Sequence, residues 1–428
     1  MAKNFLFVSL EGLITDIAWQ VAKEGHAVKY FIQNPEEREL GDGFLEKTDD
    51  WEAELDWADV VVFDDVLGQG KMAEQLRKEG RKVIGGTEYT DRLEDERGFG
   101  QEELRKHGIS IAPYREFDSL LKAIEFVRRN PDRYVLKPSG QAQSVKGLLF
   151  VGEERDGKDL VQVLEAYRQA WEKRLPAFQL QKRVVGVEVA VGAFFNGEEF
   201  LEPININFEH KKLFPGDLGP ATGEMGTTMY WSSPNKIFNA TLKKFRGTLA
   251  DEGYVGYVDL NCIVNSRGVY PLEWTARFGY PAISIQQEGL ITPIGQLLFD
   301  LACGKTFRFK ARKGFQVGVR IVLPPFPFED RETFRVKSRD SIIYFTDEPQ
   351  GVHLEDVKRV DGEWVITGTS GVALIVCGTG PTMKRAQKQA YRRISNILIP
   401  NMYYRKDIGD RWFEDGDRLH TWGYLRGV

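Results

Sequence analysis

Hydrophobic and polar residues alternate most clearly in two short runs of the chain, at 257–263 and 269–275. In each run the side chains change character at every second residue, which is typical of a β-strand with one buried face. Residues 265–268 read Asn-Ser-Arg-Gly, a composition that favours a tight turn. The pattern predicts a β-hairpin in which we expect Asp259 and Glu273 to face each other.

Acidic residues inside apolar strands need a compensating partner, because an isolated charge is costly to bury. Thr275 lies two residues after Glu273 and therefore on the same face of its strand. Two acids and a hydroxyl on neighbouring strands favour a hard-cation site, with Asp259, Glu273 and Thr275 as ligands of Mg²⁺ or Mn²⁺. The alternative is an edge hairpin whose acids are solvated.

The first 90 residues alternate between short apolar runs and an amphipathic segment, which predicts a parallel α/β unit. The loop after the first strand, residues 9–13, holds Gly12 alone, whereas a dinucleotide fingerprint needs three glycines. A nicotinamide dehydrogenase is therefore disfavoured. Strands are expected at 4–10, 27–32, 59–63 and 82–84, with a helix near 14–24 and a further helix at 91–105.

The length of 428 residues suits two or three domains. No apolar run approaches the roughly twenty residues of a membrane span, and the chain starts with a strand-like run, so we expect a cytoplasmic protein without a membrane partner. The three cysteines lack metal-ligand spacing and are expected to be buried free thiols. The net charge of −5 gives no general attraction to nucleic acid.

Two lysines follow strand-like runs in the next part of the chain. Lys137 ends one such run, and Lys146 stands beside Gly147 in a loop before another. A single lysine at a strand end is ordinarily a solvated charge. Here a connecting strand at 178–183 and then Glu188 follow in order, which suits a nucleotide held between two sheets. The lysines would reach phosphates, and Glu188 would accept hydrogen bonds from ribose.

This order of features resembles the ATP-grasp superfamily, and longer segments are similar to the phosphoribosylamine-glycine ligase family. Residues 209–227, EHKKLFPGDLGPATGEMGT, resemble the family segment DHKR…GDxGPNTGGMG. Residues 272–281, LEWTARFGYP, are similar to LEFNxRFGDPE, and 404–409 are similar to YRxDIG. The resemblance covers nearly the whole chain, although glycine-rich segments such as 216–227 are also common as plain surface turns.

The resemblance implies an ATP-grasp fold of mixed α/β and α+β class. An N-terminal α/β domain would span 1–90, the ATP-grasp domain 91–309 with a lid at about 115–190, and a small C-terminal domain 310–428. The implied activity is ATP-dependent joining of a small carboxylate to an amine through an acyl phosphate, with phosphoribosylamine and glycine or with a different amine or acid. ATP and Mg²⁺ or Mn²⁺ would be the cofactors.

The resemblance also implies roles for individual residues. His210 is either a general base or a structural histidine, and the glycine-rich loop would offer N–H groups to an anion. The catalytic residues would be Arg277, Lys211 and His210. The nucleotide-binding residues would be Lys137, Lys146, Gly147, Gln181, Arg183, Glu188, Gly223 and Gly226.

Two departures from the family pattern leave alternatives open. The family's N-terminal GSGGREHA loop is replaced here by residues 9–16, SLEGLITD, and Thr275 stands where the family has asparagine. A weaker metal ligand at that position would fit an ATP-binding protein with impaired catalysis and a structural or regulatory role. The basic segment 384–411 lacks interleaved aromatic residues on a sheet, so no nucleic-acid partner is expected. The oligomeric state stays open.

Overall fold

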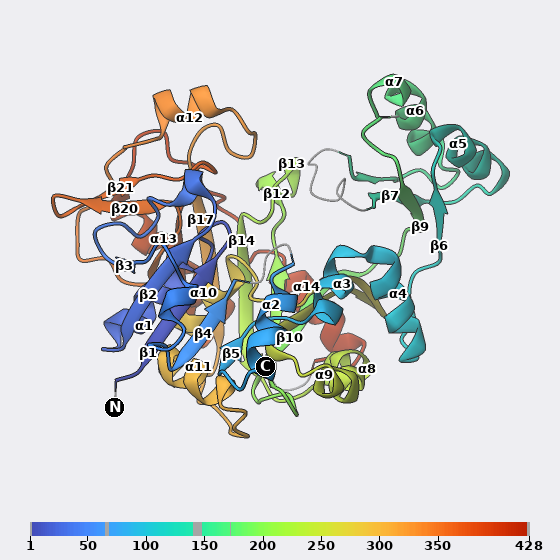
Figure 1. Cartoon of the computed structure of the whole chain (residues 1–428). Coiled ribbons are helices and arrows are strands. Elements are labelled where there is room, and N and C mark those ends of the chain that lie inside the picture. Colours follow the sequence, from blue (N-terminus) through green and yellow to red (C-terminus); the bar gives the residue numbers. More distant parts are fainter. Residues whose placement is uncertain (1, 65–67, 140–147, 172, 426–428) are drawn as a thin grey trace.

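The computed structural model describes residues 2–64, 68–139, 148–171 and 173–425. Three sheets with their helices make up most of it (Figure 1). The sheet of the N-terminal segment lies at the left of the view together with elements from residues 315–394, and a small sheet with its own helices stands apart at the upper right. None of the helices in these ranges is long and apolar enough to cross a membrane.

The N-terminal segment forms a five-stranded parallel sheet in the order β3-β2-β1-β4-β5, as the alternating pattern predicts. Residues 5–8 of β1 and 60–63 of β4 are apolar and buried because both faces of the sheet are covered. The last residues of β1 and β4, Ser9 and Phe63, lie at the same edge of the sheet. The strands are β1 (Asn4–Ser9), β2 (Ala27–Ile32), β3 (Glu46–Lys47), β4 (Val60–Phe63) and β5 (Val83–Ile84), with helices α1 (Thr15–Lys23) and α2 (Gly70–Lys78).

The helix predicted at 91–105 is in fact two helices, α3 (Glu88–Asp95) and α4 (Arg97–Lys106). The break falls at Glu96, whose backbone at φ −101° and ψ 86° is not helical. Thr87 caps α3 through its side-chain oxygen, which accepts from the backbone N–H of Thr90. The expected single helix was therefore wrong in its continuity.

The small sheet is antiparallel and has one apolar and one polar face. Leu136, Phe178 and Leu180 point into a core that the sheet shares with its helices, while Lys137 and Gln179, which pair in register, point to the other face. The order is β6 (Tyr114–Phe117), β9 (Phe178–Lys182), β7 (Tyr134–Pro138) and β8 (Phe150–Val151). The helices are α5 (Leu120–Arg129), α6 (Lys158–Ala166) and α7 (Arg168–Trp171).

An eight-stranded sheet forms the centre of the molecule, in the order β16-β15-β10-β11-β14-β17-β22-β19. Its described pairings are antiparallel, and it continues from the predicted ATP-grasp segment into strands beyond residue 310. The domain boundaries given above stay predictions. The strands are β10 (Val187–Asn196), β11 (Ile204–Glu209), β14 (Gly226–Ser232), β15 (Val255–Asn265), β16 (Gly268–Thr275), β17 (Phe315–Val322), β19 (Val352–Leu354) and β22 (Val372–Gly380).

The hairpin predicted at 257–275 is present as β15 and β16, but its register differs from the expected one. Asp259 pairs with Thr275, and Asn261 pairs with Glu273. The prediction that Asp259 and Glu273 face each other directly was therefore wrong by two positions. An irregularity in the register between Asn261 and Cys262 changes the pairing toward the turn, and such a shift cannot be read from alternation alone.

The remaining elements surround the central sheet. The segment predicted as a glycine-rich loop at 216–227 contains a strand of a small hairpin and the start of β14. That hairpin is β12 (Lys212–Phe214) with β13 (Leu218–Ala221). Two further pairs are β18 (Tyr344–Phe345) with β23 (Ile397–Leu398), and β20 (Val357–Val360) with β21 (Glu363–Ile366). The helices are α8 (Lys236–Ala240), α9 (Arg246–Asp251), α10 (Ala282–Glu288), α11 (Ile294–Ala302), α12 (Arg331–Lys337), α13 (Met383–Ile394) and α14 (Trp412–Thr421).

Candidate active site between two sheets

The polar face of the eight-stranded sheet gathers acidic side chains from β10, β11 and the hairpin. Alternation along β10 sends Val187, Val189 and Val191 into the main core and Glu188 to the opposite face. The same rule places Glu209 of β11, Asn261 of β15 and Glu273 of β16 on that face, because the strands pair in matching register. Alternation therefore assembles the acids that form the site.

Lys211 lies at the centre of these acids. Its Nζ is 2.9 Å from Glu188 Oε1, 2.9 Å from Glu273 Oε1 and 3.2 Å from Glu209 Oε2. Asn261 Nδ2 donates to Glu188 at 3.2 Å and to Glu209 at 3.1 Å, so the amide contacts two of the same three carboxylates. The lysine and the amide hold the carboxylates against their mutual repulsion.

The pKa values of Glu273 and Glu209 in this cluster are shifted in opposite directions. Lys211, with smaller contributions from Lys137 and Arg97, lowers the pKa of Glu273 to about 2. Burial raises the pKa of Glu209, and the neighbouring Glu273 and Glu188 act in the same direction. Burial would lower the pKa of Lys211, but the three carboxylates outweigh it and raise the value well above normal. Glu273 therefore stays ionised at all physiological pH values.

The polar face of the small sheet contributes the second side of the site. Lys137 is 7% exposed, and burial together with the charge of Arg97 lowers its pKa to about 8, although Glu273 opposes this change. Burial also lowers the pKa of Arg97, which Glu273 partly offsets. Lys137 and Arg97 therefore lie close enough to Glu273, across the two sheets, for its charge to affect their pKa values.

Four of the residues predicted to bind the nucleotide fall within 146–183, and the structure describes two of them, Gln181 and Arg183. Gln181 is buried on the polar face of β9 beside Val135, and its Nε2 has no hydrogen-bond partner among the described residues. Arg183 donates to the carbonyl of Gly152 at 2.9 Å and pairs with Glu153, away from Lys211. Lys146 and Gly147 lie outside the described residues.

Oxygen atoms suited to a hard cation are present on this part of the hairpin, and the ligand set given above stays a prediction. Asp259 is 7% exposed and accepts from Asn207 Nδ2 at 3.0 Å, and burial followed by the charge of Glu209 raises its pKa to about 7. Asn261 faces Glu273 instead, and its buried Oδ1 has no hydrogen-bond partner among the described residues. Thr275 lies opposite Asp259.

Glu273 and the amide oxygen of Asn261 fit a magnesium ion that is carried mainly by substrate phosphates. Mg²⁺ is usually held by one or two protein oxygens together with phosphate oxygens and water. In the part of the chain that the structure describes, no three histidine, cysteine or acidic side chains are placed to hold a metal by themselves.

His210 and the predicted glycines have structural surroundings. His210 is 1% exposed, and burial with the nearby Arg411 and Arg405 lowers its pKa to about 4. Its Nε2 accepts from the backbone N–H of Gly409 at 3.3 Å, and its role stays open between the two alternatives given above. A Cβ at Gly226 would lie 2.5 Å from the carbonyl oxygen of Gly318, so this glycine permits the close pairing of β14 with β17. Gly223 is exposed, and a Cβ there would lie 3.9 Å from Arg320.

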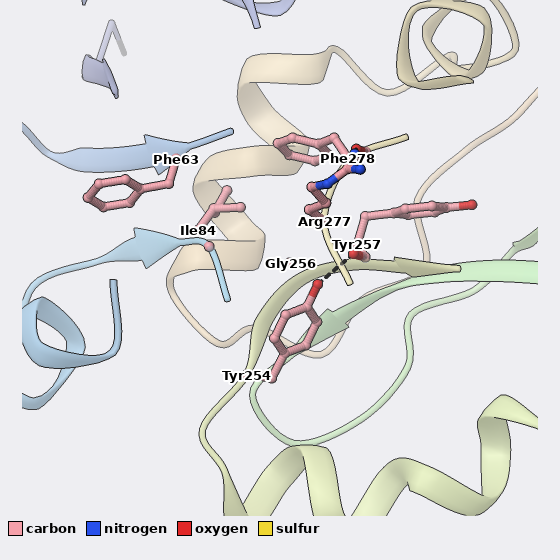
Figure 2. Close-up of a pocket in the computed structure, with 8 residues that line it drawn as sticks. Phe63, Ile84, Tyr254, Gly256, Tyr257, Arg277 and Phe278 are labelled. Atoms are coloured by element: carbon pink, nitrogen blue, oxygen red, sulfur yellow. Dashed lines mark hydrogen bonds between the residues drawn. The ribbon is translucent and has the colours of Figure 1, made fainter. Parts of the chain in front are cut away.

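Arg277 lies outside the Lys211 cluster, in a pocket between the N-terminal sheet and the hairpin. Its Nη2 is 2.7 Å from Glu94 Oε1, and Nη1 donates to the carbonyl of Phe278 at 2.9 Å. Figure 2 shows Phe63 and Ile84 on one side of this pocket, and Arg277 with Phe278 and two tyrosines on the other. Arg277 thus joins the segment after β16 to α3, and it lines a pocket whose other side is formed by the last residues of β4 and β5.

Sequence reasoning found Lys137, Lys211, Glu188 and Glu273, which the structure brings together, but it did not assign Asn261, Glu209 and Arg97 to the site. Alternation from Asp259 would have placed Asn261 on the same face. Glu209 opens the segment that carries the family resemblance. The helical break that precedes Arg97 gave no comparable signal.

Comparison with known proteins places these features in a family. Residues 95–283 match the family model described as phosphoribosylglycinamide synthetase, ATP-grasp (A) domain, and residues 326–411 match the C domain of the same synthetase. The phosphoribosylamine–glycine ligase of Streptococcus pneumoniae is 23% identical over 359 residues, which cover 81% of this chain and 82% of the relative.

Solved structures show the same fold. The crystal structure of the phosphoribosylamine–glycine ligase of Thermotoga maritima matches with a TM-score of 0.71 at 21% identity, over 95% of this chain and all of the other. The biotin carboxylase domain of the Hydrogenobacter thermophilus 2-oxoglutarate carboxylase, solved with MgADP, ADP and bicarbonate, matches with a TM-score of 0.63 at 12% identity over the full length of both chains. These likenesses establish the ATP-grasp fold.

Proposed function

Because the chain belongs to the phosphoribosylglycinamide synthetase family of ATP-grasp proteins, we propose that it is an ATP-dependent ligase that joins a carboxylate to an amine through an acyl phosphate. The observation that carries this proposal is the meeting of two polar sheet faces. Lys137 on the small sheet lies within the electrostatic range of Glu273 on the central sheet, and Lys211 pairs with Glu273 directly. Two facing sheets that carry cations and a carboxylate of low pKa suit the binding of a nucleoside triphosphate between them.

The reaction proceeds in two displacements. A carboxylate oxygen of the acid attacks the γ-phosphorus of ATP, the bond from that phosphorus to its bridging oxygen breaks, and ADP leaves. The amine nitrogen then attacks the acyl carbon, the bond from carbon to the phosphate oxygen breaks, and the nitrogen loses a proton. The products are an amide, ADP and inorganic phosphate, and no covalent bond to the protein forms.

The residues of this chain act by position and charge. Lys137 and Arg97 supply positive charge on the side of the site opposite Glu273. Lys211 supplies a further positive charge on the central sheet, where three carboxylates hold it in place. Glu273 and Asn261 would hold a magnesium or manganese ion, which would neutralise charge on the phosphates when bound. In phosphoryl transfer these positioning and electrostatic effects supply most of the rate enhancement.

Hydroxylamine trapping tests this proposal without knowledge of the amine, because hydroxylamine converts acyl phosphates into stable hydroxamates. The protein would be incubated with ATP, Mg²⁺, hydroxylamine and a panel of small carboxylates that includes glycine. We expect one class of carboxylate to give a hydroxamate with stoichiometric ADP. Glu273→Gln should lower this rate by about 100-fold or more, whereas Glu125→Gln, an exposed position on α5, should not change it.

Two outcomes would count against the proposal. A Glu273→Gln protein as active as the parent would remove Glu273 from the chemistry. Calorimetric binding of an ATP analogue with Mg²⁺, but no hydroxamate from any carboxylate, would favour the alternative of an ATP-binding protein with impaired catalysis.

A further inference from the structure

Glu224 is a buried glutamate next to the Lys211 cluster, between β13 and β14. In the segment 209–227 it stands where the family pattern GDxGPNTGGMG has its second neighbouring glycine, so this chain adds a carboxylate at that point. The residue is 5% exposed. A carboxylate that is brought into the interior in this way needs a compensating partner or a ligand.

Backbone hydrogen bonds fix the position of Glu224 beside Lys211. The N–H of Thr222 donates to the carbonyl of Lys211 at 2.8 Å. On the other side, Arg320 Nη1 of β17 donates to the backbone carbonyl of Glu224 at 3.0 Å. The residue is therefore held between the segment of Lys211 and β17 by contacts that do not use its own carboxylate.

The carboxylate of Glu224 has no partner among the described residues. Its Oε1 is buried without a hydrogen bond, and no nitrogen of a described lysine, arginine or histidine lies within 4.0 Å of its oxygens. The other glutamates of the site differ, because Glu188, Glu209 and Glu273 all contact Lys211 Nζ at 2.9 to 3.2 Å. The Glu224 carboxylate is thus available to a group of the substrate.

The surroundings of Glu224 make its carboxylate a stronger base than a glutamate in water. Burial raises its pKa well above the usual range, and the negative charges of Glu209 and, to a smaller extent, Glu355 act in the same direction. Arg320 and Lys211 oppose this change without outweighing it, and Arg320 pairs with Glu355 at 3.2 Å. A general base is most effective when its pKa lies near the operating pH, and a raised pKa brings a carboxylate closer to that range.

The order of strands places Glu224 beyond the groups that are proposed to face the phosphates. From the hairpin the central sheet runs β16, β15, β10, β11, β14 and β17. Glu273 of β16 and Lys211 after β11 come first, and Glu224 follows at the beginning of β14. Because the charge of Lys211 influences the pKa of Glu224, an acyl phosphate held by this lysine would lie close to the unpartnered carboxylate.

We propose that Glu224 is the proton acceptor of the second displacement, in which the amine attacks the acyl phosphate. The proposal rests on the ligase function inferred above and adds a residue to the same site. As the nitrogen bonds to the acyl carbon, the bond from carbon to the phosphate oxygen breaks and phosphate leaves with the bonding electrons. A proton from the nitrogen passes to the Glu224 carboxylate, which later releases it to solvent. The step is the same for any primary amine.

Two measurements on the whole protein separate the two displacements. Saturating hydroxylamine traps the acyl phosphate without the help of a protein base, so hydroxamate formation reports the first displacement. Amide formation from the same carboxylate and ammonium chloride, alone or with ribose 5-phosphate to supply phosphoribosylamine, requires the second and is followed by mass spectrometry. In Glu224→Gln the ratio of amide to hydroxamate formation should be about 100-fold lower than in the parent, at the lower end of general base effects.

The pH dependence distinguishes a proton acceptor from a structural residue. Only the ionised carboxylate can accept the proton, so the rate of amide formation per neutral ammonia should rise with pH through the pKa of Glu224 in the parent. This rise should be absent in Glu224→Gln. Glu224→Asp keeps a carboxylate and should recover about tenfold of the lost ratio. Glu198→Gln changes an exposed position after β10 and should alter neither rate.

The outcomes distinguish this inference from the proposed function. An unchanged ratio in Glu224→Gln, whether both rates persist or both fall, would overturn the inference, because a structural role affects both displacements together. A parent that forms hydroxamate but no amide from either source of amine would also overturn it and leave acyl phosphate formation standing. Absence of hydroxamate with every carboxylate would instead overturn the ligase function on which the inference rests.

Discussion

Carboxyl groups have very different pKa values in this protein according to what surrounds them. Glu273 has its pKa lowered to about 2 by Lys211 and further cations, whereas burial raises the pKa of Asp356 to about 8, helped by Glu37. Glu37 and Asp356 approach each other beside Gly368, where an added Cβ would lie 2.8 Å from Glu37 Oε2 and 3.1 Å from Asp356 Oδ2. The Glu273 carboxylate is ionised and can bind a cation. Ionisation of Asp356, in contrast, lowers the stability of the folded state.

We expect Asp356→Asn to make the protein less sensitive to alkaline pH. The folded pKa of about 8 lies above the unfolded value of about 4, so the stability linked to this group is present below pH 4 and is lost as pH rises to about 8. Asparagine still accepts the hydrogen bonds from the Ser370 hydroxyl and backbone N–H. The variant should gain about 1–4 kcal/mol relative to the parent between pH 5 and pH 9 in urea unfolding.

Asp49→Asn removes an exposed carboxylate and serves as the control for this experiment. Its unfolding free energy should follow that of the parent at every pH. If Asp356→Asn did the same, neither burial of Asp356 nor its repulsion from Glu37 would raise its pKa in solution.

At the scale of elements, alternation in the sequence was sufficient to predict the strands and the face on which each acid lies. It placed Glu188 and Glu273 correctly, since a strand sends every second side chain to one face. It could not give the register of β15 against β16, which depends on an irregularity between Asn261 and Cys262. For this reason Asn261, the direct partner of Glu273, was missed. The assignment of Asp259 as a metal ligand stays a prediction.

Close approach between strands is a second feature that alternation does not reveal. Gly192 of β10 pairs with Asp259, and a Cβ there would lie 2.0 Å from the Tyr257 hydroxyl and 2.7 Å from Asp259 Oδ2. Both side chains are buried, so neither can move away without disturbing the packing. Because residue 192 is a glycine, the side chains of Tyr257 and Asp259 can pack directly against the backbone of β10.

Gly192→Ala should therefore lower the free energy of unfolding by about 1–3 kcal/mol through overpacking. Gly247→Ala in α9 is the matched control, because a Cβ there meets nothing within 4 Å and alanine favours a helix by about 0.5–1 kcal/mol. Urea unfolding of both variants measures the difference. Equal effects of the two substitutions would show that Asp259 and Tyr257 do not pack over Gly192.

At the scale of the whole molecule, the fold class could be predicted from the sequence, but the contacts between distant segments could not. The parallel N-terminal sheet and the two-sheet site follow from local pattern and family resemblance. Asp16 and His353, in contrast, are 337 positions apart and meet in a buried ion pair that joins α1 to β19. Single-sequence patterns carry no information on such a pairing, because each partner alone resembles an ordinary polar residue.

This pair should contribute to stability far more than an exposed pair that joins the same parts of the chain. Burial would lower the pKa of His353, but Asp16 outweighs it and raises the value well above normal, and both side chains are 4% exposed. The linked stability is present below the unfolded histidine pKa of about 6.5 and is lost as pH rises through the folded value. It is therefore largest between about pH 4 and pH 6.5, where Asp16 is also ionised.

A double-mutant cycle at pH 6 with Asp16→Asn and His353→Gln should give a coupling free energy of about 2–4 kcal/mol, since removal of one partner leaves the other charge buried. The same cycle on Glu36 and Arg331, which are 2.7 Å apart but mostly exposed, should give about 0–1 kcal/mol. At pH 9 the first coupling should decrease toward the second. If the two couplings were equal at pH 6, Asp16 and His353 would not act as a buried link.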